Sequence, residues 1–274
     1  MIIRIAMMQK DEAVLLRPWI DYHSALVGAR NLTIFDNGSS DPGVLGVLDA
    51  AEGEGVEVIR DYPTFEHFSA KGTLIADRIK AFDRDDPADF YFPLDCDEFL
   101  VAQRRNDTIA TDTAGLEEAL RPHLGAPEVL RIGFGFDNDP REKGRFFPKG
   151  RAKSFFAMNA CDHLDLGFHR ARARSTAETQ IVDVGYLHLH NKPLPLLQDG
   201  ARQKMLGRVA DFSRETLIAH REARGQGFHL INELLFETEE EYFDFVREKY
   251  AKAQAIHFPG FLDRMTALNT EVPY

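Results

Sequence analysis

The chain has 274 residues, of which 44% are hydrophobic and 28% charged, so it can bury a large core and is not composed like a disordered or fibrous protein. Its 44 acidic and 33 basic residues give a net charge of -11, which argues against a nucleic-acid partner. With two cysteines and no apolar run long enough to span a bilayer, we expect a cytoplasmic protein without a transmembrane segment, the alternative being a peripheral one at the inner face of the membrane.

The first sixty residues alternate between strand and helix patterns. Short apolar runs at 2–8, 31–35 and 56–59 are typical of buried strands. Between them, residues 13–27 and 44–51 place apolar side chains at helical spacing. This order predicts parallel strands joined by right-handed crossovers.

The pattern continues with a helix at 72–82 and a fourth strand at 90–94. Beyond it we predict a helix at 116–124, a strand at 129–136, a basic loop at 140–153 and a strand at 181–189.

From residue 193 onward the chain is predicted to be mainly helical. Helices are expected at 194–209 and 216–224, and a third opens at Thr238, with Glu241 three residues later in a capping-box pattern. Since no internal repeat or low-complexity linker interrupts the chain, we predict an α/β domain over 1–192 and a helical extension over 193–274 that packs on it.

An apolar run that begins at Tyr91 ends abruptly in three acids, Asp95, Asp97 and Glu98. Alternate residues at the end of a strand point the same way, so Asp95 and Asp97 are expected to address one nucleotide and its metal together, with Glu98 as a support. Ligands of open parallel sheets bind at the carboxyl ends of the strands, which makes this a candidate Mg²⁺ or Mn²⁺ site. The alternative is a solvated turn whose acids cap the next element.

Two further polar junctions are expected at the same edge of the sheet. Lys10-Asp11-Glu12 follows the first strand, and a run from Asp36 to Asp41 follows the second. Ordinary helix capping is the alternative for both. The first junction contains no glycine, which argues against a dinucleotide-binding loop, a Walker loop and the phosphate loop of sugar nucleotidyltransferases.

Four ordered motifs resemble the family-2-type glycosyltransferases, in particular the bacterial branch related to family 92. The motifs are Lys10-Asp11-Glu12, Trp19-Ile20-x-Tyr22-His23, Phe35-Asp36-Asn37-Gly38-Ser39-Ser40-Asp41 and Leu94-Asp95-Cys96-Asp97-Glu98-Phe99. Weaker similarities are Phe134-Gly135, Lys153-Ser154 and the stretch from His188 to Lys204. The chain departs from the family at Asp11, where Asn is frequent, and at Asn191-Lys192-Pro193, where an aromatic-basic sequence is frequent.

The resemblance implies a GT-A fold, a Rossmann-like and mostly parallel mixed sheet flanked by helices. It also implies a hexosyltransferase that uses Mn²⁺ or Mg²⁺ and a nucleotide-sugar donor, with UDP as the expected nucleotide. The acceptor would be a hydroxyl of a glycan, a lipid-linked molecule or a small molecule, and inversion is the expected outcome. A sugar nucleotidyltransferase and a non-catalytic nucleotide-sugar-binding module are the alternatives.

The resemblance also assigns roles to individual residues. Those implied at the nucleotide are Lys10, Asp11, Glu12, Asp36, Asn37, Lys71 and Asp95, with Asp36 at the base or ribose. Those implied at the metal are Asp95, Asp97, His188 and His190, and imidazole ligands favour Mn²⁺ over Mg²⁺. For the catalytic base we predict Asp137, with Asp139 and Asp162 as further candidates.

Two other clusters invite competing interpretations. Cys161, Asp162, His163 and His169 could join the later histidines in a zinc site, although their spacing matches no common zinc pattern. Arg170, Arg172 and Arg174 alternate with other residues, which indicates either a basic stripe for an anionic ligand or a solvated strand face.

Overall fold

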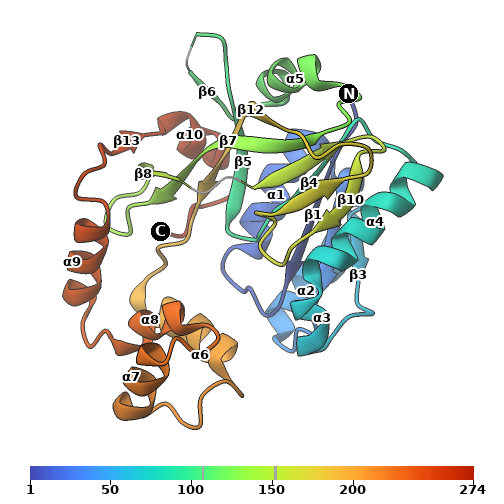
Figure 1. The fold of residues 1–274 in the computed structure, drawn as a ribbon. Helices are drawn as coiled ribbons and strands as arrows, with labels where there is room; N and C mark the ends of the chain where they lie inside the picture. Colours follow the sequence, from blue (N-terminus) through green and yellow to red (C-terminus); the bar gives the residue numbers. More distant parts are fainter. Residues whose placement is uncertain (107, 151–152) are drawn as a thin grey trace.

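The computed structural model describes residues 1–106, 108–150 and 153–274, and it contains a large mixed sheet flanked by helices (Figure 1). In this described part of the chain the sheet runs in the order β3-β2-β1-β4-β9-β7-β12-β5-β6, with β8 on β7 and β13 on β8. Its strands are β1 Ile3–Gln9, β2 Leu32–Asp36, β3 Glu57–Ile59, β4 Phe90–Pro93, β5 Glu98–Gln103, β6 Ile109–Ala110, β7 Val129–Asn138, β8 Arg145–Lys149, β9 Ser154–Ala157, β12 Thr179–His188 and β13 Ile256–His257. The predicted α/β class is confirmed.

The helices follow the predicted alternation in the first part of the chain. They are α1 Leu16–Val27, α2 Pro42–Gly53, α3 Phe65–Ser69, α4 Lys71–Asp85, α5 Thr113–Leu120, α6 Leu194–Met205, α7 Arg214–Glu222, α8 Ile231–Leu235, α9 Glu239–Lys249 and α10 Pro259–Ala267. Two further short strands, β10 Cys161–Leu164 and β11 Ala171–Ala173, form an antiparallel pair beside α4.

The N-terminal strands β3, β2, β1 and β4 pair in parallel, as the βαβ pattern predicts. Strand β1 lies at their centre and is buried on both faces. Ile5 and Met7 join the core cluster that contains α1 and α2, whereas Ala6 and Met8 join the cluster that contains α4. Successive side chains of a strand point to opposite faces of the sheet, so alternate residues of β1 pack against the helices on opposite sides.

Strand β12 determines how the second half of the sheet meets the first. It pairs in parallel with β7 and antiparallel with β5, and its last residue, His188, lies opposite Asp137 on one side and Glu98 on the other. This register brings side chains from three distant segments to the same end of the sheet.

The C-terminal residues are mainly helical, as predicted, but part of them completes the main core. Thr238 caps α9 by accepting a hydrogen bond from the Glu241 amide at 3.2 Å, while the Glu241 carboxylate accepts one from the Glu237 amide and not from Thr238. The α10 residues Phe261 and Met265 belong to the core cluster of the sheet.

The loop predicted at 140–153 is wrong in part, because residues 145–149 form β8. Phe146 is buried and Phe147 packs on Tyr250, with ring centroids 4.7 Å apart. Neighbouring charges and glycines concealed this strand in the sequence. Arg151 and Ala152, also in the predicted loop, lie outside the described residues.

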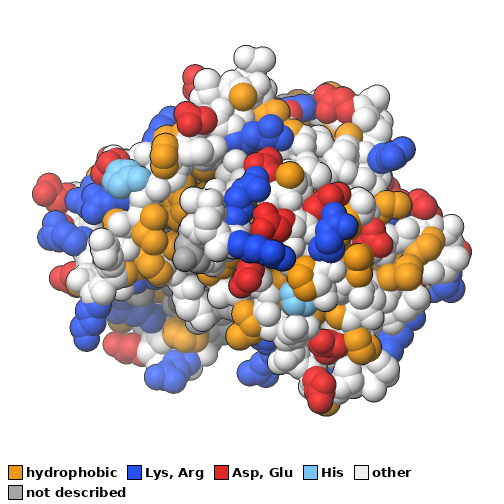
Figure 2. All heavy atoms as spheres, turned by 90° about the horizontal axis from the view of Figure 1, so that it is seen from above, with side chains coloured by type: hydrophobic (Ala, Val, Ile, Leu, Met, Phe, Trp, Pro, Cys, Tyr) orange, Lys and Arg blue, Asp and Glu red, His pale blue; other side chains and the backbone are white. Residues whose placement is uncertain are grey.

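The outer face shown in Figure 2 carries acidic and basic side chains interspersed, without a continuous field of one sign. No helix in the described part of the chain is long and apolar enough to cross a bilayer.

His23 links α1 to β5 inside the core. Its Nδ1 lies 2.9 Å from the Trp19 carbonyl oxygen, and its Nε2 lies 3.2 Å from the Leu100 amide nitrogen. Since the amide must donate, Nε2 accepts and Nδ1 donates, which is the neutral ring. Burial lowers the pKa of His23 to about 3, although the bond to Trp19 opposes this effect.

The buried neutral His23 predicts an acid-dependent loss of stability. Because its pKa is lower in the folded than in the unfolded chain, the stabilisation exists above the unfolded value of about 6.5 and is lost as the pH falls below it. We expect the unfolding free energy of the wild type to lose about 2 kcal/mol more than that of His23→Gln between about pH 7 and pH 5. Urea titrations of both proteins measure this difference. The control is His163→Gln, an exposed histidine, and its unfolding free energy should change with pH as that of the wild type does. If the unfolding free energies of wild type and His23→Gln changed equally with pH, His23 would not be the buried neutral group.

Candidate functional site

The chain turns sharply at the carboxyl end of β4, and this turn separates the two acids of the Asp-x-Asp motif. Strand β4 ends at Pro93, and β5 begins at Glu98. The carbonyl oxygen of Asp97 accepts a hydrogen bond from the Leu189 amide at 2.8 Å, which ties the turn to the end of β12. Asp95 and Asp97, expected to address one nucleotide and its metal together, have separate partners here, lysines for Asp95 and a histidine for Asp97.

Asp95 lies in a cluster with two lysines. Its carboxylate contacts Lys71 at 2.6 Å and also pairs with Lys153. Lys153 in turn lies 2.6 Å from Glu98, whose carboxylate accepts a hydrogen bond from the Asp95 amide. Burial opposes the charge of Asp95, but the two ammonium groups hold its pKa well below the usual range.

The lysine-bound carboxylate of Asp95 does not join the histidines, which corrects its predicted grouping with the metal ligands. Lys71, predicted at the nucleotide, lies at the start of α4 and is buried against Phe168. Glu98 has the supporting role predicted for it, since it bonds both the turn and Lys153.

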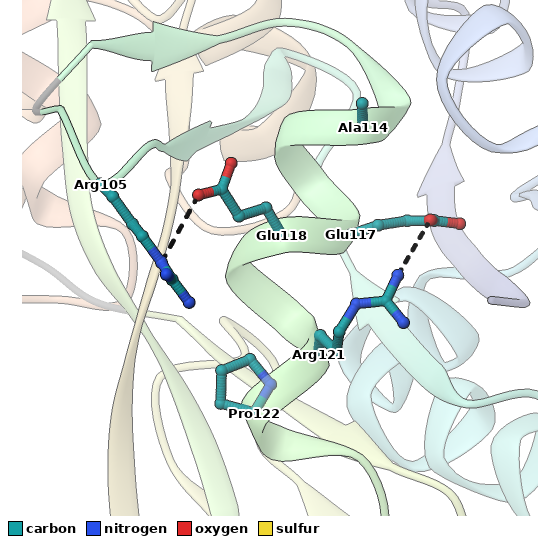
Figure 3. Close-up of a pocket in the computed structure, with 6 residues that line it drawn as sticks. All are labelled: Arg105, Ala114, Glu117, Glu118, Arg121 and Pro122. Carbon is teal, nitrogen blue, oxygen red and sulfur yellow. Dashed lines mark ion pairs between the residues drawn. The ribbon is translucent and has the colours of Figure 1, made fainter.

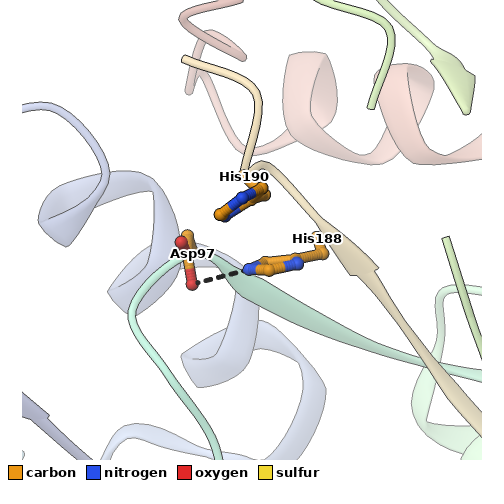
Figure 4. Close-up of side chains that lie close together, drawn as sticks. All are labelled: Asp97, His188 and His190. Carbon is orange, nitrogen blue, oxygen red and sulfur yellow. Dashed lines mark ion pairs between the residues drawn. The ribbon is translucent and has the colours of Figure 1, made fainter. Parts of the chain in front are cut away.

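Asp97, His188 and His190 form a compact group at the end of β12 (Figure 4). One potential ligand atom from each side chain lies within 4.8 Å of the other two. His188 Nε2 is 3.3 Å from Asp97 Oδ1, and the two imidazole rings stack with centroids 4.8 Å apart. Of the four residues predicted at the metal, the structure brings these three together.

Asp137 holds His188 from the opposite side. Its Oδ1 lies 2.8 Å from His188 Nδ1 and 3.1 Å from Lys149, while its Oδ2 accepts a hydrogen bond from Tyr250 and lies 3.6 Å from Lys249. Both carboxylate oxygens are therefore occupied, and the side chain is buried. This environment suits a residue that orients His188 and does not favour the predicted role of catalytic base.

The charges within the site are strongly interdependent. Burial lowers the pKa of His188, but Asp97 and Asp137 outweigh it and raise that pKa to about 9. Burial and the neighbouring His188 lower the pKa of His190 to about 3. Burial opposes ionisation of Asp97, yet His188 keeps the pKa of this carboxyl well below its ordinary value. The group therefore contains an ionised carboxylate and one neutral imidazole.

The loops after β1 and β2 contain several residues predicted to bind the nucleotide, and hydrogen bonds join these two loops to each other. Asp36 accepts from Gln9 Nε2 at 2.7 Å, and the Asn37 side chain donates to the carbonyl oxygens of Tyr62 and Thr64. Asp11 has a positive φ of 50° and accepts from the Ser40 and Asp41 amides. These contacts hold the two junctions together. Helix capping, the alternative for both junctions, is found at Asp41, which accepts a hydrogen bond from the Val44 amide at the start of α2, whereas α1 begins without a side-chain cap.

The remaining residues of the first junction differ in their surroundings. Lys10 is exposed, whereas Glu12 pairs with Lys192 at 2.6 Å and so links β1 to the segment after β12. No local pattern indicated a role for four residues whose partners lie far away along the chain, namely Gln9, Lys149, Lys192 and Tyr250. Lys153 was indicated only by the weak similarity of Lys153-Ser154 to the glycosyltransferase motifs.

The alternative clusters are not assembled in the structure. Among the described residues, the one group of three or more potential metal ligands is Asp97 with the two histidines, so Cys161 and His163 take part in none. Asp162 pairs with Arg172, and Arg174 pairs with Asp83 at 2.9 Å. Asp139, like Asp162 a further candidate for the base, is buried beside Arg141 and Arg145.

A shallow hollow of about 480 Å³ lies elsewhere, over α5 (Figure 3). Its charges are paired, with Arg105 3.7 Å from Glu118 and Arg121 3.7 Å from Glu117. None of the residues that line it is a histidine or a cysteine. The candidate metal ligands lie instead at the end of β12.

Comparison with known proteins gives weak similarities to solved structures. No protein-family model and no curated protein matches the chain. TarS from S. aureus aligns at 13% identity and a TM-score of 0.32 over 49% of this chain and 22% of TarS, and a structure of TarS residues 1–349 aligns at 0.33 over 36% of that chain. A cytidylyltransferase from Leptospira borgpetersenii aligns at 14% identity and 0.32 over 58% of this chain and 61% of its own. The chain thus spans less than two thirds of each of these proteins.

The Asp95 cluster predicts a large effect from removing one lysine. Lys153→Met leaves Glu98 buried with its charge unpaired, so we expect the unfolding free energy to fall by about 3 to 5 kcal/mol. Adding Glu98→Gln should recover part of this loss, because it removes the unpaired charge. Chemical denaturation of the single and double variants measures both steps. A Lys153→Met protein within about 1 kcal/mol of the wild type would show that the pair contributes little.

Proposed function

We propose that this chain is a metal-dependent glycosyltransferase that moves a hexose from a UDP-linked donor to a hydroxyl acceptor. The observation that carries the proposal is the group of Asp97, His188 and His190 at the carboxyl end of the sheet. Ligands of open α/β sheets bind at this edge. The fold class is also the one that the glycosyltransferase resemblance implies.

The three side chains fit a divalent transition metal. One carboxylate and two imidazoles suit Mn²⁺ better than Mg²⁺, which prefers oxygen ligands. The contact of Asp137 with Nδ1 of His188 leaves Nε2 facing Asp97, and a carboxylate behind a histidine ligand is a common way to orient it. A divalent ion held there supplies positive charge for the phosphates of the donor and for the departing nucleotide.

Two buried lysines lie in the turn that carries Asp97. Lys71 and Lys153 approach Asp95 from α4 and from the segment before β9. Asp95 and Glu98 balance these two charges, so the positive charge offered to a diphosphate would come from the metal. The absence of glycine between Met7 and Glu12 continues to argue against a nucleotidyltransferase.

The proposal predicts that Asp97 is needed for both metal and donor. We expect Asp97→Asn to weaken Mn²⁺ binding at least about tenfold, because one anionic ligand is lost, and to abolish UDP release from a panel of UDP-sugars. Electron paramagnetic resonance of free Mn²⁺ and a coupled UDP assay measure the two effects. The exposed Asp183→Asn makes the same change of charge and should behave as the wild type in both.

The remaining outcomes separate the alternative functions. Equal binding of Mn²⁺ and UDP by Asp97→Asn and wild type would show that the site is wrong. Pyrophosphate release from UTP and a sugar phosphate would indicate a nucleotidyltransferase, and binding without turnover would indicate a binding module.

A second prediction concerns the role of Asp137. If it orients His188, Asp137→Asn should weaken Mn²⁺ binding about 10- to 100-fold, as loss of an outer partner typically does. The exposed Asp183→Asn on β12 serves as the control. If Asp137 is instead the base, the variant would bind Mn²⁺ normally and lose turnover alone.

A further inference from the structure

The lysines at the carboxyl end of the sheet differ in how their charge is balanced. Three of them pair with carboxylates that no other lysine outside this set contacts, namely Lys71, Lys153 and Lys192. Lys149 and Lys249 have to share one, because among the described residues Asp137 provides the only carboxylate within 4.0 Å of either ammonium group. The carboxylate of Glu233 also acts on Lys249, but from a longer range. The excess of positive charge therefore lies at Lys149 and Lys249.

Asp137 is contacted by a basic side chain at each of its two oxygens. Lys149 Nζ lies 3.1 Å from Oδ1 and also contacts Nδ1 of His188, which lies 2.8 Å from the same oxygen. Lys249 Nζ lies 3.6 Å from Oδ2. One negative charge thus faces two ammonium groups and an imidazole, and Lys149 touches a candidate metal ligand directly.

Aromatic packing holds the two lysines on either side of Asp137. Lys149 lies on β8 and Lys249 at the end of α9 (Figure 1). The buried rings of Phe147 and Tyr250 stack between these elements, with centroids 4.7 Å apart and planes 5° apart. Phe147 shares its face of β8 with Lys149, two residues later, and Tyr250 directly follows Lys249. The stacked pair therefore fixes where the two ammonium groups stand.

Both ammonium groups have donors left for a ligand. The side chain of Lys149 is 17% exposed and that of Lys249 is 40% exposed, and each ammonium group offers three hydrogen-bond donors. Burial lowers the pKa of Lys249, Asp137 opposes this effect, and Lys149 adds to it. Since Asp137 leaves part of the repulsion between the two lysines uncompensated, a second anion between them would stabilise both charges.

The position and the charge of this pair point to the acceptor. Nε2 of His188 faces Asp97 and the candidate metal position, whereas the lysines lie on the Nδ1 side of the ring (Figure 4). A donor diphosphate would be balanced by the metal, so the lysines remain for another anion. A phosphate monoester carries about -1.5 to -2 charges near pH 7 and three acceptor oxygens, which matches two ammonium groups better than a single carboxylate does.

Building on the glycosyltransferase function proposed above, we propose that Lys149 and Lys249 form a subsite for a phosphate group carried by the acceptor. Both ammonium groups donate hydrogen bonds to the phosphate oxygens, while the free hydroxyl of the same acceptor molecule reaches the sugar of the donor. The acceptor is therefore a phosphate ester that also has a hydroxyl, either a small soluble molecule or a lipid.

The test compares wild type, Lys249→Met and Lys149→Met, each loaded with Mn²⁺ and UDP, with inorganic phosphate as the probe. Phosphate bound close to Mn²⁺ relaxes faster, so ³¹P relaxation rates over a phosphate titration give its affinity. We expect each substitution to weaken phosphate binding at least about tenfold, because one charged donor is lost. The Mn²⁺ affinity of each variant is measured alongside, which separates loss of the metal from loss of the phosphate.

A matched control and the more exposed of the two lysines keep the test decisive. Lys252→Met, an exposed lysine just beyond α9, should bind phosphate as the wild type does. If Lys149→Met does not fold, Lys249→Met decides alone.

Competition against inorganic phosphate distinguishes the two sources of the phosphate group. Displacement by glycerol 3-phosphate, with glycerol as the control, would indicate a small soluble acceptor. Displacement by vesicles of phosphatidylcholine with phosphatidic acid, a lipid phosphate monoester, would indicate a lipid acceptor, the control being phosphatidylcholine alone. Either result supports the subsite.

Four outcomes would overturn the proposal. Equal phosphate affinity in wild type and Lys249→Met would show that other groups hold the phosphate. Displacement by neither competitor would show that the subsite does not admit a phosphate ester. A wild type that binds Mn²⁺ and UDP but no phosphate would overturn the subsite alone. A wild type that does not bind UDP with Mn²⁺ would overturn the glycosyltransferase function, and the acceptor subsite with it.

Discussion

Close packing of acidic side chains, two buried and two half-buried, at one end of the sheet is the constraint on which the rest of the structure depends. Asp95, Asp97, Glu98 and Asp137 meet there because three strands end or begin at the same level. Burying an unpaired carboxylate is costly, so each must meet a cation or a hydrogen-bond donor. Lysines from α4 and the segment before β9 serve Asp95, and His188 serves the two acids that flank it.

This arrangement gives the two acids of the Asp-x-Asp motif different tasks. Asp95 is neutralised by Lys71 and Lys153 and thereby fixes the turn after β4. Asp97 meets His188, which is protonated in the metal-free protein, and the neutral His190, while Asp137 orients His188 from behind; a metal bound there would displace the proton of His188. Tyr250 and Lys249 connect that support to α9, so the C-terminal helices take part in the site.

Local patterns allowed much of the N-terminal half to be predicted. Apolar runs of strand length and helical periodicity located β1 to β4 with their helices, and the order of elements implied parallel pairing, which the structure confirms. The pattern failed for β8, where Phe146 and Phe147 stand among charged residues, and for β5, which begins directly after the Asp-x-Asp turn.

The candidate site was predictable only in part, for a physical reason. Asp97, His188 and His190 follow strand ends, so the topology alone brings them to one edge. The divergence of Asp95 depends on a turn whose geometry is set by Leu189 and Glu98, which no local pattern reveals. The enclosure of Asp137 depends on Lys249 and Tyr250 at the end of α9, more than ninety residues beyond β7. The most direct test of the metal site is anomalous diffraction from crystals grown with Mn²⁺ and UDP. The account predicts a manganese peak coordinated by Asp97, His188 and His190, and a peak held by Asp95 with both histidines uncoordinated would contradict it.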